Sequence, residues 1–190
     1  MDWYRIRHTI GLHLCSTAIK RAAYLKKHDI LYHIGENCMT MFRKVPLHAK
    51  LISFGNNVWI ASNVDFVPHD VIHRMLNHCV EGGGFQEEIG CIEIQDNVFV
   101  GSGTQILYNV RIGPNTVIAA GSLVNKDIPG NGIWGGVPAK YIGSLDSLIE
   151  KRRNAPRMEI RYGKRGLSQE TVDAYWKKFR EERRTEDGAT

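Results

Sequence analysis

The chain has 190 residues, 43% of them hydrophobic and 24% charged, which is typical of a soluble globular protein with about one domain. No apolar run reaches the roughly 18–20 residues that cross a membrane, and the first residues do not resemble a signal peptide, so we expect a cytoplasmic protein. Residues 34–143 hold seven Lys or Arg against nine Asp or Glu, so the net charge of +5 resides in the flanks and no nucleic-acid partner is expected.

The first element is a predicted helix over residues 6–27. Its apolar residues follow a near-helical spacing: Ile6, Ile10, Leu14, Ala18, Ala22 and Leu25. The segment is also basic, so it could lie on an anionic membrane surface. We favour the alternative that it packs on the end of the domain that follows, or on a neighbouring subunit.

A six-residue spacing begins after this helix. Phe54, Ile60 and Phe66 are six apart, and Val58 and Val64 lie between them at the same interval. Another unit starts at residue 34, twenty residues before Phe54. The register therefore slips by two residues between positions 39 and 53.

The spacing stops after His69 and Asp70 and resumes near Ile92. Phe66 and Ile94 are twenty-eight residues apart, which is not a multiple of six. Residues 71–91 are therefore predicted to leave the repeat as a loop, and the run of three glycines at 82–84 would let that loop act as a lid.

Six further repeats follow without interruption. The first position of each is a branched aliphatic residue, and the position four residues later is small or β-branched. The two sets are Ile94, Val100, Ile106, Ile112, Ile118 and Val124, and Val98, Thr104, Val110, Thr116, Ser122 and Ile128. Residues that tolerate left-handed backbone or tight turns occupy the third position after each aliphatic: Asn97, Gly103, Asn109, Asn115, Gly121 and Asp127.

This period fits neither an amphipathic helix nor an alternating strand. It predicts a β-solenoid in which three short strands make one coil and each inward aliphatic stacks on its counterpart eighteen residues later, for example Ile94 on Ile112. We divide the chain into an N-terminal helical segment (1–30), a repeat domain (31–143) and a C-terminal helical extension (144–190). In the extension, Ser168 is the predicted N-cap of a helix with an apolar face formed by Val172, Tyr175, Trp176 and Phe179.

His69 is the candidate catalytic residue because it stands where a regular coil gives way to the loop. Histidine is the usual proton acceptor near neutral pH. A structural loop histidine is the alternative, and either Asp70 or a backbone carbonyl could orient the ring.

Two other chemistries were weighed for this region. His69, Asp70, His73, His78 and Cys79 are metal-ligand types, but their spacing in a glycine-flanked loop without a clear helix is unlike a zinc motif, so no metal is expected. The cysteines of the chain, Cys15, Cys38, Cys79 and Cys91, have no CxxC spacing and are expected to be free thiols without a nucleophilic role.

The repeats resemble a known family. The runs AAGSLVNKDIP (119–129) and GVPAKYIG (136–143), together with IQDNVFVGS (94–102), are similar to the hexapeptide-repeat acyltransferases, and in particular to the maltose, galactoside and capsular polysaccharide O-acetyltransferases. The resemblance covers residues 34–143.

The resemblance implies a mainly β fold, a left-handed parallel β-helix with an extruded loop and flanking N- and C-terminal helices. It implies a homotrimer with active sites between subunits, acetyl-coenzyme A as acyl donor and a hydroxyl-bearing small molecule or glycan as acceptor. His69 matches the place of the family's catalytic histidine.

Positions for coenzyme A follow from the same resemblance. Ser102 and Ala120 match coil positions whose backbone meets the pantetheine arm, and Asn125 and Lys126 match the pair beside the phosphates. Lys140 stands where the family has Arg or Lys near the nucleotide, and Phe99 replaces a Trp that stacks on the ligand. Solvated charges on a coil edge are the alternative interpretation of the two lysines.

The predicted activity is O-acetylation of a sugar or surface-glycan precursor, with His69 as general base in a direct ternary-complex reaction. A xenobiotic acetyltransferase of the same fold and a non-catalytic β-helix scaffold are the alternatives. The family's sugar-site motifs have no counterpart in the N-terminal segment, so maltose and galactosides are not expected as acceptors.

Overall fold

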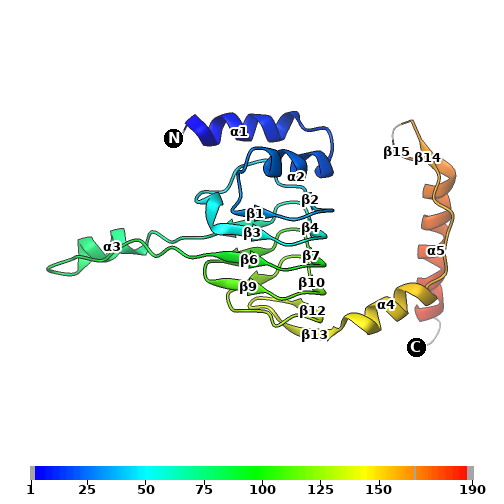
Figure 1. Ribbon diagram of the computed structural model, residues 1–190. Coiled ribbons are helices and arrows are strands. Elements are labelled where there is room, and N and C mark those ends of the chain that lie inside the picture. The colour runs from blue at the N-terminus through cyan, green and yellow to red at the C-terminus, as the bar shows by residue number, and fades with distance from the viewer. Residues whose placement is uncertain (1–2, 165, 188–190) are drawn as a thin grey trace. The chain divides into compact units, whose positions relative to one another are not determined.

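The computed structural model describes residues 3–164 and 166–187, which fall into two compact units that divide between Glu150 and Lys151. The first unit holds the N-terminal helices together with the strands of the repeat, and Figure 1 traces their order. No helix in the described ranges is long and apolar enough to span a membrane. The three-part division at residues 30 and 143 stays a prediction.

Three parallel stacks of short strands make up the repeat. The first contains β1 (His33–Ile34), β3 (Ile52–Phe54), β6 (Ile92–Ile94) and β9 (Val110–Ile112). The second contains β2 (Met39–Thr40), β4 (Val58–Ile60), β7 (Val98–Val100), β10 (Thr116–Ile118) and β12 (Gly132–Gly135), and ends on the antiparallel β13 (Lys140–Ser144). The third contains β5 (Asp65–Val67), β8 (Gln105–Leu107) and β11 (Leu123–Val124).

From β3 to β11, consecutive strands enter the three stacks in rotation, so we call one strand from each stack a coil. The predicted eighteen-residue pairings are confirmed: Ile94 pairs with Ile112, Val100 with Ile118, and Ile106 with Val124. The aliphatic residues of the six-residue period are buried throughout, from Ile94 to Val124. Burial of each such side chain contributes about 1.5–3 kcal/mol to the stability of the fold. A single coil could not bury its own aliphatic residues, so several coils must stack.

The turns between successive strands need residues that tolerate a left-handed backbone, and the six-residue period supplies them. Asn57, Asn97, Asn115 and Asn131 all have positive φ and form a ladder of amide hydrogen bonds 2.9–3.0 Å long. At another turn, a Cβ on Gly101 would lie 2.5 Å from the backbone nitrogen of Ala120, so only glycine lets these coils approach.

The N-terminal segment forms two helices, not the single helix predicted over 6–27. They are α1 (Trp3–Leu14) and α2 (Ala18–Lys27), and Thr17 caps the second by accepting a hydrogen bond from the Lys20 nitrogen. The buried face also differs, because His8 and Leu12 are buried whereas Ile10 and Leu14 are exposed. A new N-cap restarts the helical phase, and spacing alone does not reveal such a break.

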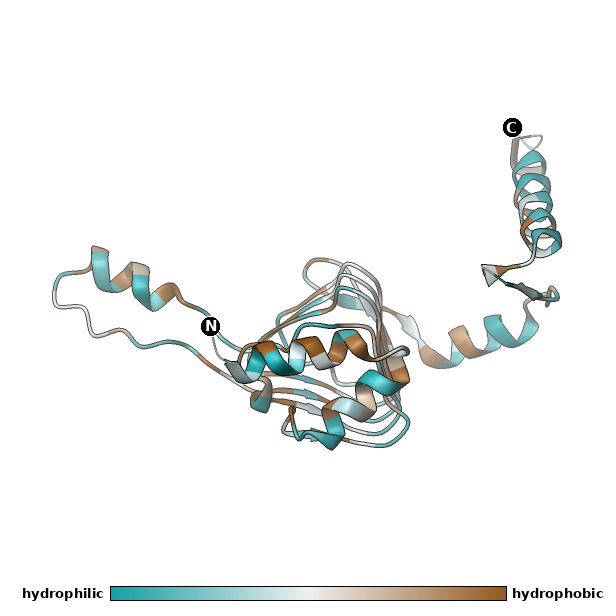
Figure 2. Cartoon of the chain, turned by 90° about the horizontal axis from the view of Figure 1, so that it is seen from above, coloured by the Kyte–Doolittle hydropathy of each residue, from teal (hydrophilic) through white to brown (hydrophobic). Residues whose placement is uncertain are grey.

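The two helices lie across the end of the strand stack, as Figures 1 and 2 show from two directions. Arg21 of α2 is 2% exposed and ties the helices to the first coil. Its guanidinium donates to the carbonyl oxygens of Thr40 (3.0 Å) and Cys15 (3.3 Å). The predicted packing of the segment on the end of the repeats is therefore confirmed.

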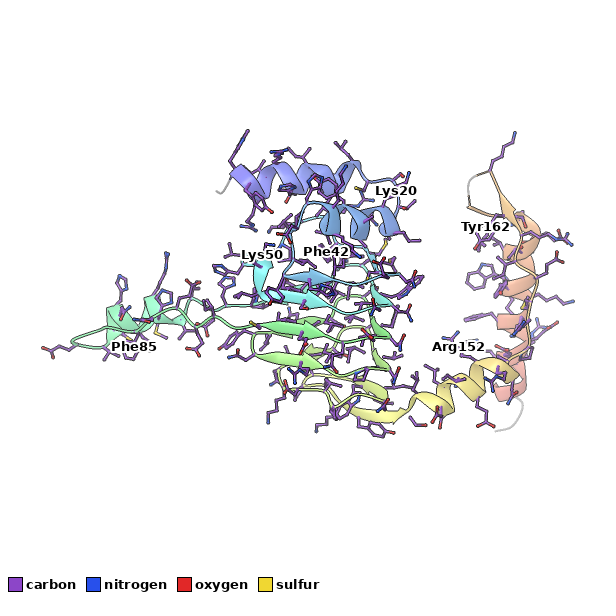
Figure 3. The ribbon with its side chains drawn as sticks, in the orientation of Figure 1. Lys20, Phe42, Lys50, Phe85, Arg152 and Tyr162 are labelled. Carbon is purple, nitrogen blue, oxygen red and sulfur yellow. The ribbon has the colours of Figure 1, made fainter. Side chains whose placement is uncertain are left out.

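The predicted loop leaves the body between β5 and β6 (Figure 1). It contains an unpredicted helix, α3 (Ile72–Cys79), whose first N–H donates to Asp70 Oδ1 at 3.0 Å. The helix buries none of its residues, although Ile72, Met75, Leu76 and Cys79 follow a helical spacing. Figure 3 shows Phe85 on this loop and Phe42 within the body below α2.

The remaining elements are α4 (Leu145–Asn154), the short hairpin of β14 (Tyr162–Gly163) and β15 (Gly166–Leu167), and α5 (Gln169–Asp187). Ser168 caps α5 as predicted, because its Oγ accepts a hydrogen bond from the Thr171 nitrogen at 3.3 Å. Tyr175, Trp176 and Phe179 form an exposed face on this helix.

Candidate active site

The structure places His69 at the point where the loop leaves the body. The two ends of the loop meet here, where His69 and Ile89 form an antiparallel β-bridge. The Asp70 nitrogen donates a hydrogen bond to the Glu88 carbonyl, and the Gly90 nitrogen donates one to the Pro68 carbonyl, both at 2.9 Å. The backbone of His69 is thus held by β5 on one side and by the returning loop on the other.

The His69 ring is packed but not hydrogen-bonded at one nitrogen. Its Nδ1 is buried and has no hydrogen-bond partner within the described residues. The ring of His48 meets it edge to face, with centroids 5.1 Å apart. Packing against His48, rather than a carboxylate, orients the imidazole in this chain.

His48 is a further site residue and is not among those predicted from the sequence. Its backbone is left-handed, with φ of 51°, and its Nε2 lies 3.6 Å from Glu87 Oε1 in the returning loop. One feature could have found it: His48, like His69, stands at an interruption of the six-residue register.

Asp70 does not orient His69 through a hydrogen bond. Its Oδ1 accepts from the Ile72 nitrogen and its Oδ2 accepts from the Tyr108 hydroxyl at 2.9 Å. The hydrogen bond to this carboxylate raises the pKa of Tyr108 above its usual value. Asp70 therefore fixes the base of the loop by linking α3 to the turn after β8.

A pocket of about 770 Å³ opens beside His69. It runs along β5, from Ser62 and Asn63 before the strand to His69 after it, and the chain from residue 41 to residue 47 forms its other wall. A ligand of the size of a sugar derivative fits this volume with one end at the imidazole.

Phe99 and Ser102 lie on one coil, and Ala120 lies on the next. Phe99 is 42% exposed on the outer face of β7, in register between Trp59 and Val117. Ser102 and Ala120 are exposed at equivalent turns between the second and third stacks, where the Gly121 nitrogen donates to the Ser102 carbonyl at 2.8 Å.

Asn125, Lys126 and Lys140 share a second pocket, of about 330 Å³. Trp134 and Pro138 also line it, and the Val137–Pro138 peptide bond is cis. Neither lysine has a carboxylate partner within 4 Å among the described residues. This pocket and the one beside His69 share no lining residue.

The metal-ligand types near the loop do not assemble. Across residues 3–164 and 166–187, no three His, Cys, Asp or Glu side chains are grouped as a metal site. His78 instead bonds within α3, through Nδ1 and the Arg74 carbonyl oxygen at 2.6 Å.

Parts of the chain are similar in sequence to known proteins. Residues 92–126 match the family model described as bacterial transferase hexapeptide (six repeats). A galactoside O-acetyltransferase of Escherichia coli (strain K12) is 37% identical over 115 residues, which are 60% of this chain and 54% of that protein. The chain spans about half the length of the curated relatives it matches.

Solved structures extend the match beyond the repeat. A galactoside acetyltransferase in complex with coenzyme A superposes with a TM-score of 0.55 at 25% identity, over 87% of this chain and 88% of that one. A maltose O-acetyltransferase from Clostridium difficile 630 gives a TM-score of 0.52 at 26% identity, over 74% and 84%. Residues 92–126 therefore carry hexapeptide repeats, and the chain is similar to the galactoside and maltose O-acetyltransferases.

Proposed function

We propose that this chain is an O-acetyltransferase that moves the acetyl group of acetyl-coenzyme A to a hydroxyl of a sugar or surface-glycan precursor. The observation that carries the proposal is His69, held at the loop base on the wall of a sugar-sized pocket, in a relative of sugar O-acetyltransferases. The four cysteines are free, in keeping with the reducing cytoplasm, where we place the reaction.

His69 acts as the general base in this proposal. The neutral imidazole takes the proton of the acceptor hydroxyl while the hydroxyl oxygen bonds to the thioester carbonyl carbon. The carbon–sulfur bond then breaks, and the departing thiolate receives the proton from the imidazolium. The products are an acetyl ester and free coenzyme A, and no acyl-enzyme forms. Proximity of the two bound substrates supplies much of the rate.

The lysine pocket has the chemistry that coenzyme A requires. Lys126 and Lys140 are exposed cations free of carboxylate partners among the described residues, and Asn125 lies beside them, so they suit the phosphates. Phe99 offers an exposed ring for stacking. Small residues at Ser102 and Ala120 leave the backbone of the turns open to the pantetheine arm.

We also propose that the repeat is a left-handed β-helix and that three chains form a trimer. The two pockets share no lining residue on one chain, and we propose that neighbouring subunits bring the two halves of the site together. A scaffold protein would have no need for either half.

Thiol release from acetyl-coenzyme A tests the proposal against nucleotide sugars, oligosaccharides and hydroxylated antibiotics. We expect release with a sugar acceptor and a loss of about 10²–10⁴-fold in His69→Ala. The control His33→Ala alters an exposed histidine on β1 and should be fully active.

Unchanged turnover in His69→Ala would show that another group is the base. Release only with antibiotics would replace the glycan acceptor by a xenobiotic. Absence of both release and coenzyme A binding would favour the scaffold.

A further inference from the structure

The pocket beside His69 has an unusual charge. Three cations line it, Arg5, Arg43 and Lys44, whereas Asp65 is the one carboxylate among its lining residues. The surrounding repeat is not cationic, since residues 34–143 hold more acids than bases. Arg5 comes from the basic N-terminal segment, whereas Arg43 and Lys44 come from the repeat, which as a whole is not cationic.

None of the three cations is neutralised by an ion pair within 4 Å in the described part of the chain. Nearby lysines differ in this respect: Lys50 pairs with Asp29 at 2.6 Å, and Lys26 pairs with Glu36. The charge in the pocket is therefore available to a ligand.

The fold holds the two arginines of the pocket in place. Arg5 of α1 donates from Nε and Nη2 to the Val45 carbonyl at 3.3 and 3.2 Å, and the Val45 nitrogen donates to Thr9 Oγ1 at 3.2 Å. Arg43 donates from Nη1 to the His13 carbonyl at 3.2 Å. These carbonyl oxygens fix the guanidinium groups without cancelling their charge, so the pocket wall is organised before a ligand arrives.

We propose that the acceptor carries an anionic group, a phosphate or a carboxylate, that binds to Arg5, Arg43 and Lys44 while its hydroxyl reaches His69. This inference rests on the proposed function and specifies its substrate class. Guanidinium and ammonium groups bind such anions through charge-assisted hydrogen bonds. A neutral glycoside would leave three cations without a partner.

Matched acceptors test the inference. Glucose 1-phosphate and glucuronate supply a phosphate and a carboxylate, and methyl glucoside is the neutral counterpart. We expect kcat/KM for at least one anionic acceptor to exceed that for the neutral one by about tenfold or more. The better of the two anions identifies whether the natural acceptor is phosphorylated or carries a uronate-type acid.

Lys44→Ala is the most direct variant because Lys44 is exposed and makes no hydrogen bond or ion pair in the described structure. It should lower kcat/KM about 5- to 30-fold for the anionic acceptor and by a clearly smaller factor for the neutral acceptor. Lys27→Ala is the control, because it removes an exposed lysine at the end of α2 that does not line the pocket. Raised salt should mimic Lys44→Ala.

Calorimetric titration with the same two anions separates this inference from the proposed function. Equal turnover of neutral and anionic acceptors, unaffected by Lys44→Ala, overturns the inference and leaves the acetyltransferase intact. Anion binding that is lost in Arg43→Ala/Lys44→Ala, without acetyl transfer to any acceptor, supports the pocket and overturns the function. The absence of both anion binding and anion-selective turnover overturns the inference.

Discussion

The rings of His48 and His69 meet at a centroid distance of 5.1 Å and an interplanar angle of 81°. The backbone of His48 is left-handed, and its Nε2 lies 3.6 Å from Glu87 Oε1 in the returning loop. A single side chain thus contacts both the candidate base and the segment that encloses it. This makes His48 a positioning residue for His69.

Replacement of His48 should therefore impair turnover more than donor binding. His48→Asn keeps a residue that tolerates positive φ but removes the ring that packs on His69. We expect kcat to fall about 10- to 100-fold, with little change in the KM for acetyl-coenzyme A, because a displaced base loses its alignment with the hydroxyl. Steady-state kinetics on the acceptor found by thiol release measure both values.

His33→Asn is the matched control, since it makes the same change at an exposed site outside the pocket. A His48→Asn enzyme with wild-type kcat would exclude the positioning role.

Subunit mixing should reveal whether the site is shared. His69→Ala lacks the base, and Lys126→Ala/Lys140→Ala lacks the predicted phosphate contacts. Co-expressed in one cell, the two inactive chains should recover activity, because about a quarter of the interfaces in random trimers pair an intact His69 with intact lysines. The readout is thiol release by the purified mixture relative to each parent alone. Activity no higher than that of the parents would place the whole site within one chain.

The inward stack should tolerate little loss of volume. Ile118 is fully buried and pairs with Val100 on the preceding coil, whereas Val117, its neighbour on β10, points outward and is half-buried. Ile118→Ala should lower the free energy of unfolding by about 2–5 kcal/mol through the lost burial and the cavity. Urea denaturation measures this loss, and Val117→Ala should cost clearly less. Equal losses of stability in the two variants would contradict a structure in which Ile118 points inward and Val117 points outward.

Stability should fall in mild acid because of His8. This residue is buried beside Tyr24, and its pKa is lowered by burial first and then by the charges of His28 and Arg7. Below about pH 6.5 the unfolded chain takes up a proton that folded His8 resists, so its contribution is complete above that pH and is lost as the pH falls toward the folded pKa.

The measurement is urea denaturation at several pH values between about 7.5 and 5.5. The wild type should lose more stability over this range than His8→Phe, which has no titrating ring. Parallel curves would mean that His8 does not contribute to the pH dependence.

Much of the repeat follows from the sequence alone. The interval of six puts a branched aliphatic residue on the inside of each strand from β6 to β11, and Asn97 or Gly103 at the turns permits the backbone that closes each coil. These are local requirements repeated many times, so a single chain displays them as a pattern. His69 was also visible, as the residue at which that pattern stops.

Other features were decided by contacts between distant residues. The break at Thr17 and the burial of His8 depend on how two helices meet the first coil, and spacing within one helix carries no record of that surface. His48 packs on His69 because the segment between β2 and β3 lies beside the end of β5, and Glu87 reaches His48 because the loop returns to the body. The cations of the pocket come from α1 and from the chain after β2, which are brought together by tertiary packing. A periodic sequence determines the coil, but the site at its edge is made of irregular segments whose positions only the folded chain fixes.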